Sequence, residues 1–367
     1  MKRALTLCTC VLFHALAGCA PAPRPAARVA DAEPVTMRFD YAGAEAIMDA
    51  LEKDSLSDAD VDALLTIHGV RAMVDNVTRF VPAGVPEFRR DIQAFVRTKR
   101  GDENSYFQLG DAWRQREQVR ALLAATRRDS AAIVRQMLSR LEPYRPDTGP
   151  LDIGVHFVAG GVSDGFAFED DPPAFYANLV RAQGDLHGLL LNALHETYHV
   201  MQMAAQRRSG TFVAWITDAS VPPVERLLAG TLVEGTANLV ADPTGSTGPG
   251  PDMDRARARY ARNTAPARVA ENFALFDRVL REVGEGRMSW DSASWLGLSR
   301  NNDDRFYFVG YEMARAIERY CGPACIGRLF DEPPVEFFRK YIALYREHPE
   351  IGGRFSAGTE RALTPGG

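Results

Sequence analysis

The stretch "LLLNALHETYHVMQ", residues 189–202, carries two histidines four positions apart, with a glutamate directly after the first. Residues four apart on an α-helix lie one turn apart on the same face, so His195 and His199 would direct both imidazoles at one point. Glu196 lies beside them, within reach of a water on a bound metal. The spacing predicts a zinc site in which two histidines are ligands and Glu196 is the general base.

The helix that carries these residues is apolar almost all round, which predicts that it is buried. Its apolar positions are Leu189, Leu190, Leu191, Ala193, Leu194, Val200 and Met201. Two histidines and a carboxylate inside such a helix are costly unless a metal or hydrogen bonds use them. The alternative is a pair of hydrogen-bonded core histidines without a metal.

A catalytic zinc needs a third protein ligand. The metzincin pattern would require Gly at 202 and His at 205, but the chain has Gln202 and Ala205, which excludes that class. The gluzincin pattern takes a glutamate from a second helix. "TLVEGTANL" supplies Glu234 among apolar neighbours, followed by Gly235, which would let two helices approach closely. The other acidic candidates, which we consider less well placed, are Asp218, Glu225 and Asp242.

Three motifs together resemble one family. "LHETYHVMQ", "LVEGTANL" and "FYFVGYEMARAIERYCG" look like the gluzincin-type zinc-dependent peptidases that bacteria export. The resemblance covers residues 150–345 and implies Zn²⁺ on His195, His199 and Glu234, Glu196 as base, and a peptide or protein substrate. Asn238 follows Glu234 by one turn and is either hydrogen-bonding support for the ligands or a packed polar residue.

The same resemblance suggests how a reaction centre could be completed. Gluzincins often use a tyrosine or histidine to stabilise the oxyanion, and "RFYFVGYEMA" offers Tyr307 and Tyr311 as catalytic candidates, although an aromatic core stripe would look the same. The segment "VHFVAGG" resembles the edge strand on which such peptidases bind an extended peptide.

The elements that must position these residues are mostly helical. From residue 37 to 142 the apolar spacing predicts helices, and residues 147–168 predict a β-hairpin or two short strands because Gly-Gly and Ser-Asp-Gly follow an apolar run. Helices are predicted over 184–208, ending at Gly210, and over 221–242. The fold class predicted is mainly α with a small β element (α+β), in a zincin-like arrangement of an active-site helix and a glutamate helix.

The N-terminus predicts export. Lys2 and Arg3 precede a short apolar run that ends in "LAGC", Leu16–Cys19. This end resembles a bacterial lipobox, which implies lipid on Cys19 and membrane attachment; the alternative is a plain signal peptide. Ala20 after the cysteine implies the outer membrane, with the protein facing the periplasm.

Composition changes along the chain suggest its organisation. We expect a lipoprotein signal peptide at 1–18, a Pro/Ala-rich tether at 19–36, an N-terminal helical region at 37–150, a zinc-peptidase-like region at 151–350 and a polar tail at 351–367. After loss of the signal, Cys321 and Cys325 in "YCGPACIG" remain as the cysteine pair, and an oxidising compartment favours a disulfide between them.

Charge and motifs limit the functions. A net charge of −5 offers no basic field for nucleic acid, so no such partner is expected. The first hypothesis is a lipid-anchored zinc metallopeptidase. The alternatives are a catalytically inactive binding lipoprotein, with or without zinc, and a zinc amidase that acts on a non-peptide envelope substrate.

Overall fold

The computed structural model describes the chain from residue 35 to 364, apart from residues 101–104, 169–172, 217 and 300–301. The chain divides into two units, Met1–Ala32 and Glu33–Gly367, and all described residues belong to the second. The signal, lipobox and most of the tether predicted above therefore lie outside the described residues.

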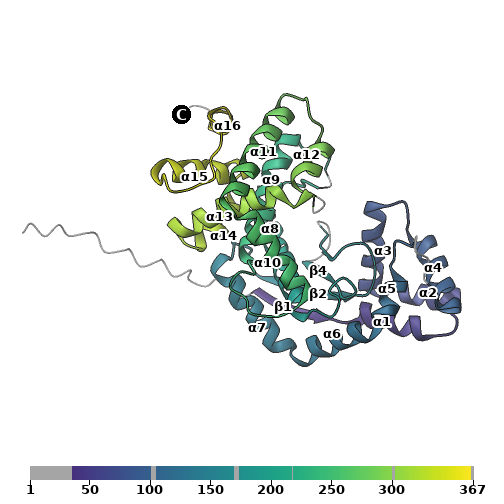
Figure 1. The fold of residues 1–367 in the computed structure, drawn as a ribbon. Coiled ribbons are helices and arrows are strands. Elements are labelled where there is room, and N and C mark those ends of the chain that lie inside the picture. The colour runs from purple at the N-terminus through teal and green to yellow at the C-terminus, as the bar shows by residue number, and fades with distance from the viewer. Residues whose placement is uncertain (1–34, 101–104, 169–172, 217, 300–301, 365–367) are drawn as a thin grey trace, which may run out of the picture. The chain divides into compact units, whose positions relative to one another are not determined.

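A four-stranded sheet forms the β part of the fold, in the order β1-β2-β4-β3. Figure 1 labels β1, β2 and β4. Its strands are β1 Val35–Asp40, β2 Leu151–Val158, β3 Gly165–Phe166 and β4 Ala174–Asn178. β1 and β4 both pair parallel with β2, and β3 pairs antiparallel with β4. Of the two alternatives predicted for 147–168, the pair of short strands is confirmed by β2 and β3, and the hairpin is wrong because β4 lies between them in the sheet. The segment "VHFVAGG" is also not an edge strand, because β2 lies in the interior of the sheet.

Helices make up most of the described chain, which confirms the predicted α+β class. Those between β1 and β2 are α1 Ala42–Glu52, α2 Asp58–Leu65, α3 His68–Phe80, α4 Val85–Thr98, α5 Leu109–Arg114, α6 Arg116–Arg128, α7 Ser130–Leu141 and the 3₁₀ helix η1 Glu142–Tyr144. α1 and α3 pack on β2, and α7 packs on β1. These helices thus cover the sheet that supports the predicted metal helix.

The second half of the chain is helical after β4. Its helices are α8 Leu186–Ser209, α9 Pro223–Val240, α10 Pro251–Asn263, α11 Pro266–Gly284, α12 Trp290–Gly297, α13 Arg305–Cys321, α14 Ala324–Arg328, the 3₁₀ helix η3 Leu329–Asp331, α15 Pro334–Glu347 and α16 Ala357–Leu363. No helix in the described part of the chain has both the length and the apolar character that crossing a bilayer requires.

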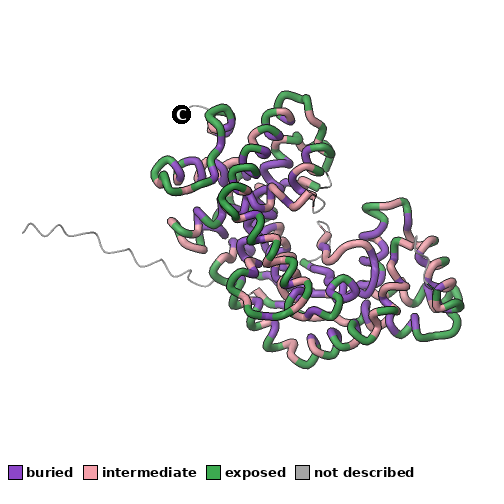
Figure 2. The backbone as a smooth tube through the Cα atoms, in the orientation of Figure 1, coloured by how far each residue is buried: buried purple, intermediate pink, exposed green. Residues whose placement is uncertain are grey.

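The core is centred on α9, which is buried from Arg226 to Val240. It contacts α8 on one side and α13, α11 and α15 on others. In Figure 2 strands β2 and β4 and helix α9, located by their places in Figure 1, are drawn mainly as buried. The glutamate helix is therefore enclosed from Arg226 onward, and only its first turn reaches the surface.

Candidate metal centre

The metal helix α8 begins at a capped N-terminus and ends at a glycine. The Asp185 carboxylate accepts from the Gly188 N–H at 2.9 Å, and its other oxygen accepts from the N–H groups of Asp252 and Met253 at the start of α10. Gly210 stops the helix in the left-handed region, with φ of 74°. One buried carboxylate thus fixes the starts of two helices, α8 and α10.

His195, His199 and Glu234 meet at one point between α8 and α9. The two histidine Nε2 atoms lie 3.0 Å apart. Glu234 Oε2 lies 3.2 Å from His195 Nε2 and 3.3 Å from His199 Nε2. A tetrahedral zinc with bonds of about 2.0–2.1 Å needs ligand atoms about 3.3–3.4 Å apart. The three side chains therefore fit the ligand set of a zinc ion.

The remaining acidic candidates are engaged elsewhere. Asp242 accepts from the Tyr311 hydroxyl at 2.6 Å, Asp218 accepts from Ser220, and Glu225 is exposed in the first turn of α9. Among the described residues Glu234 is the carboxylate grouped with the two histidines.

A close helix contact holds Glu234 in place. A Cβ atom on Gly235 would come within 2.3 Å of the Gly310 backbone on α13, and one on Gly310 would come within 2.1 Å of the Thr231 carbonyl oxygen. Side chains larger than hydrogen cannot fit at this crossing. The glycine after Glu234 therefore allows the close approach predicted for it, and α13 is the helix that approaches.

Gln202 holds the His199 ring and was missed by the sequence reasoning. Its Oε1 lies 2.7 Å from His199 Nδ1, while its Nε2 donates to the Val233 carbonyl at 3.0 Å and to Thr236 Oγ1 at 2.8 Å. Since Gln202 Nε2 donates to two acceptors, Gln202 Oε1 must be the atom that faces the imidazole. His199 Nδ1 is therefore the ring nitrogen that carries the hydrogen of this bond. The His199 ring is thereby oriented with its own Nε2 toward the metal position.

The signal for Gln202 was present in the sequence. It is a polar residue three positions after His199 in an otherwise apolar stretch, and the structure shows that it has no exposed surface. In the sequence, position 202 serves only to exclude the metzincin pattern.

The charges of the three candidate ligands stabilise one another. Burial lowers the pKa of His199, but the charge and hydrogen bond of Glu234, with the charge of Glu196, outweigh it and raise the pKa to about 9. Burial would raise the pKa of Glu234, but the His199 charge and the hydrogen bonds from both histidines hold it far below its usual range. Without a metal, the site therefore holds a protonated His199 beside a Glu234 carboxylate.

Glu196 lies next to this cluster on α8. Its carboxylate has no hydrogen-bond or ion-pair partner among the described residues, while its charge contributes to raising the pKa values of His199 and Tyr307. A carboxylate close to the ligands but not bound to them is available to exchange a proton.

The structure separates the two tyrosine candidates. Burial, then the charge of Glu234, raises the pKa of Tyr307 well above its usual value, and a hydrogen bond with Glu234 contributes. Tyr311 instead donates its hydroxyl to Asp242. Of the two, Tyr307 is the one that interacts with the candidate ligand Glu234.

Asn238 is buried, but its side-chain nitrogen has no hydrogen-bond partner among the described residues. The backbone carbonyl oxygen of Asn238 accepts from the Tyr260 hydroxyl at 2.7 Å. The hydrogen bond to a ligand that we considered for Asn238 is not seen, and Gln202 makes such a bond instead.

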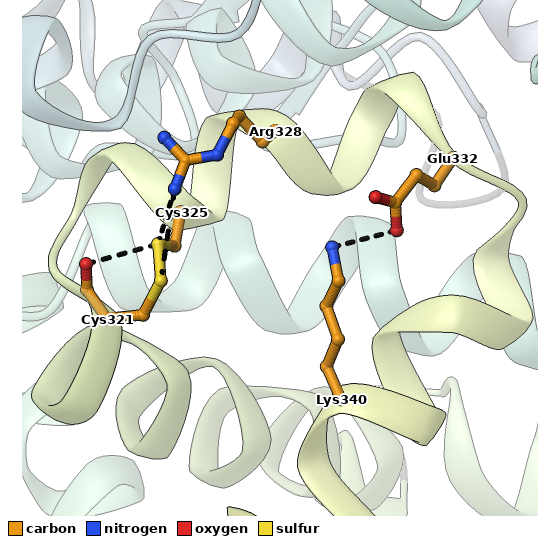
Figure 3. Close-up of a disulfide and its surroundings, with 5 residues drawn as sticks. All are labelled: Cys321, Cys325, Arg328, Glu332 and Lys340. Carbon is orange, nitrogen blue, oxygen red and sulfur yellow. Dashed lines mark hydrogen bonds and ion pairs between the residues drawn. A yellow bond between two sulfur atoms is a disulfide. The ribbon is translucent and has the colours of Figure 1, made fainter. Parts of the chain in front are cut away.

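The cysteine pair lies at the end of α13. Cys321 and Cys325 form a disulfide, and Arg328 Nη2 lies 2.7 Å from Cys325 Sγ (Figure 3). The bridge joins the last residue of α13 to α14. Cys19, the predicted lipidation site, lies outside the described residues.

Comparison with known proteins gives one match. A family model described as "Putative zinc dependent peptidase (DUF5700)" matches residues 61–350, which include both histidines, Glu196, Glu234 and both tyrosines. No curated protein and no solved structure matches the chain.

Proposed function

Because this chain belongs to the zinc-dependent peptidase family whose model spans residues 61–350, we propose that it is a zinc metallopeptidase with its metal on His195, His199 and Glu234. The observation that carries this proposal is the triangle of ligand atoms, 3.0 to 3.3 Å on each side, with the Glu196 carboxylate next to it. Neither the fold alone nor the family name assigns these roles.

Zinc held there would polarise a scissile carbonyl and make water more acidic. The protein side chains supply the proton transfers and the charge stabilisation. Glu196 accepts a proton from the attacking water and later delivers it to the leaving amine. The Tyr307 hydroxyl, held protonated by its raised pKa, donates a hydrogen bond to the oxyanion.

The sheet edge beside α8 supports a peptide substrate. The Asn178 N–H donates to the Asp164 carbonyl, so the backbone N–H and C=O groups of Asp164 and Phe166 point toward β4. In an antiparallel pair these groups alternate in direction along the strand, so those of Gly165 point away from β4, to the outer edge of the sheet. Among the described residues β3 pairs with β4 alone. A Cβ on Gly165 would come within 2.8 Å of Asn192 Nδ2, one turn before His195. Backbone groups suited to pairing with an extended chain thus lie next to the metal helix.

We further propose that the protein is exported and anchored in the bacterial envelope by lipid on Cys19, at the outer membrane and facing the periplasm. The support is the sequence: a basic start, a short apolar run and "LAGC". Labelling of cells with radioactive palmitate should mark the wild type and not Cys19→Ala; equal labelling of both would remove the anchor from the proposal.

The decisive experiment is Glu196→Gln. We expect the purified variant to bind zinc at one equivalent but to lose hydrolysis of a mixed peptide library, because the metal ligands remain while the base is gone. Glu225→Gln is the matched control, since Glu225 is an exposed acid on α9 and should leave both properties unchanged.

Each other result has a meaning. Wild-type protein without stoichiometric zinc would identify a binding lipoprotein. A zinc-loaded wild type that leaves every peptide intact but cleaves envelope amides would identify an amidase. Full peptide hydrolysis by Glu196→Gln would refute Glu196 as the base.

A further inference from the structure

The turn before α13 has an unusual backbone. Asp303 and Asp304, which directly precede the helix, have φ of 73° and 51°. Two consecutive residues with a Cβ in the left-handed region are strained, although aspartate tolerates it better than most residues. Such strain persists where the surrounding structure fixes it, and it is concentrated at functional sites.

Three arginines fix this turn from two other helices. Asp304 accepts from Arg259 Nη1 at 2.6 Å, and Asp303 accepts from Arg262 Nε at 2.8 Å and Arg268 Nη2 at 3.1 Å. Arg259 and Arg262 belong to α10, and Arg268 belongs to α11. The Asp304 side chain is only 4% exposed, so its ion pair is almost fully enclosed.

An ordinary capping role does not explain Asp304. An aspartate at the N-cap normally has an extended backbone and accepts a hydrogen bond from the first turn of its helix. Asp304 occupies the N-cap of α13, yet its backbone is left-handed and its side chain makes no capping bond. Its carboxylate forms an ion pair with Arg259 instead, and this contact stabilises the position of the turn relative to α10.

The turn determines where Tyr307 lies. Tyr307 is the third residue of α13, between the fixed turn at Asp304 and the close crossing of Gly310 with α9. A helix held at both points cannot slide or rotate without breaking one of them.

We propose that Asp303, Asp304 and their arginines form a positioning device that directs the Tyr307 hydroxyl toward Glu234 and the metal position. Asp303 and Asp304 are positioning residues, because they act through Tyr307. This inference rests on the proposed function, since the benefit of the strained turn is a correctly placed Tyr307.

A double-mutant cycle tests it. Asp304→Asn keeps a residue that tolerates the left-handed region but removes the charge that holds Arg259. We expect kcat to fall roughly tenfold with KM unchanged, as for loss of a transition-state contact. In a Tyr307→Phe background, the same substitution should have no further effect on kcat. If Asp304→Asn lowered kcat by the same factor in the Tyr307→Phe background as in the wild type, the defect would be a general structural one and the proposal would be overturned.

Two further variants control for folding. Arg262→Gln disrupts the same turn from a half-exposed position, and it should reproduce the loss in the wild-type background only. Glu360→Gln removes a comparable partly buried partner of Arg346 and Tyr345 between α15 and α16, and should leave kcat unchanged. Equal losses in Glu360→Gln would indicate general destabilisation and count against the device.

A second readout separates this proposal from the proposed function. The zinc dissociation constant can be measured for the same cycle, because Tyr307 contacts the ligand Glu234. Coupling between Asp304→Asn and Tyr307→Phe in zinc affinity, in a protein that hydrolyses nothing, would refute the peptidase and keep the positioning device. Hydrolysis by the wild type with no coupling in either readout would refute the device and keep the peptidase.

Discussion

The hydrogen bond from Gln202 to His199 gives a measurable prediction about zinc affinity. Gln202→Leu removes the acceptor 2.7 Å from His199 Nδ1 and leaves the ring free to turn. The partners that it abandons keep other bonds: Thr236 Oγ1 still donates to the Leu232 carbonyl at 2.8 Å, and the Val233 carbonyl lies within α9. The fold should therefore survive while the metal site loosens.

The size of the effect follows from two routes. Loss of a partner to a metal-bound histidine typically costs about 10–100-fold in metal affinity. At about 1.4 kcal/mol for each factor of ten, that is about 1.4–2.8 kcal/mol. A hydrogen bond between neutral groups contributes about 0.5–1.5 kcal/mol, and one to a charged group about 1.5–3. The range from the metal sites lies within the span of the hydrogen-bond values, and its midpoint of about 2.1 kcal/mol corresponds to about a thirtyfold loss of zinc affinity.

The assay is competition for zinc against a coloured chelator at pH 7. Gln206→Leu is the matched control, because Gln206 lies one turn further on α8, is 2% exposed, and has a side-chain nitrogen with no partner among the described residues. Gln206→Leu should keep the wild-type zinc dissociation constant. Equal constants for the two variants would refute a specific role for Gln202.

Three other predictions concern proton release on zinc binding, the stability of the metal-free protein and the helix crossing. Zinc binding at pH 7 should release roughly one proton, and almost none at pH 10, because the pKa of His199 is about 9 and the metal takes neutral imidazole. Calorimetry in buffers of different ionisation enthalpy measures the release, and a constant value through pH 10 would contradict this reasoning. In the metal-free protein the raised pKa of His199 adds stability in full below about pH 6.5, and this contribution disappears as the pH rises through about 9. Gly235→Ala should lower the free energy of unfolding, measured by urea titration, by about 1–3 kcal/mol or more, because its Cβ would meet the Gly310 backbone. Gly245→Ala is the control: it has open space around it and should change the same free energy by less than about 0.5 kcal/mol.

The two helices that bring the candidate ligands together could be predicted because their signals are local. The expected 184–208 and 221–242 are close to the observed Leu186–Ser209 and Pro223–Val240, and Gly210 ends α8 as expected. The HExxH spacing works within one helix, so it needs no knowledge of the rest of the fold.

The sheet could not be predicted in the same way. β1 was included in a helical region, and β4 was not recognised, because it is short and buried on both faces and so lacks an alternating pattern. β1 finds its partner 116 residues later, where Thr36 bonds to Asp152, and no local pattern reports such pairing. Gln202 was missed for a related reason: its two acceptors lie on α9, so its role exists only once α8 and α9 have packed together.

The distant pairing of β1 with β2 also affects when the metal site forms. Closing a loop of this length costs conformational entropy before any contact repays it, and parallel pairing is slow to form. α8 packs on β2 and β4, so the metal helix acquires its support only after that closure. Glu234 and Tyr307 lie still later in the sequence. A chain emerging from a ribosome or a translocation channel thus presents the histidines before the glutamate, and the three candidate ligands can meet only after Glu234 has emerged and α8 and α9 have packed together.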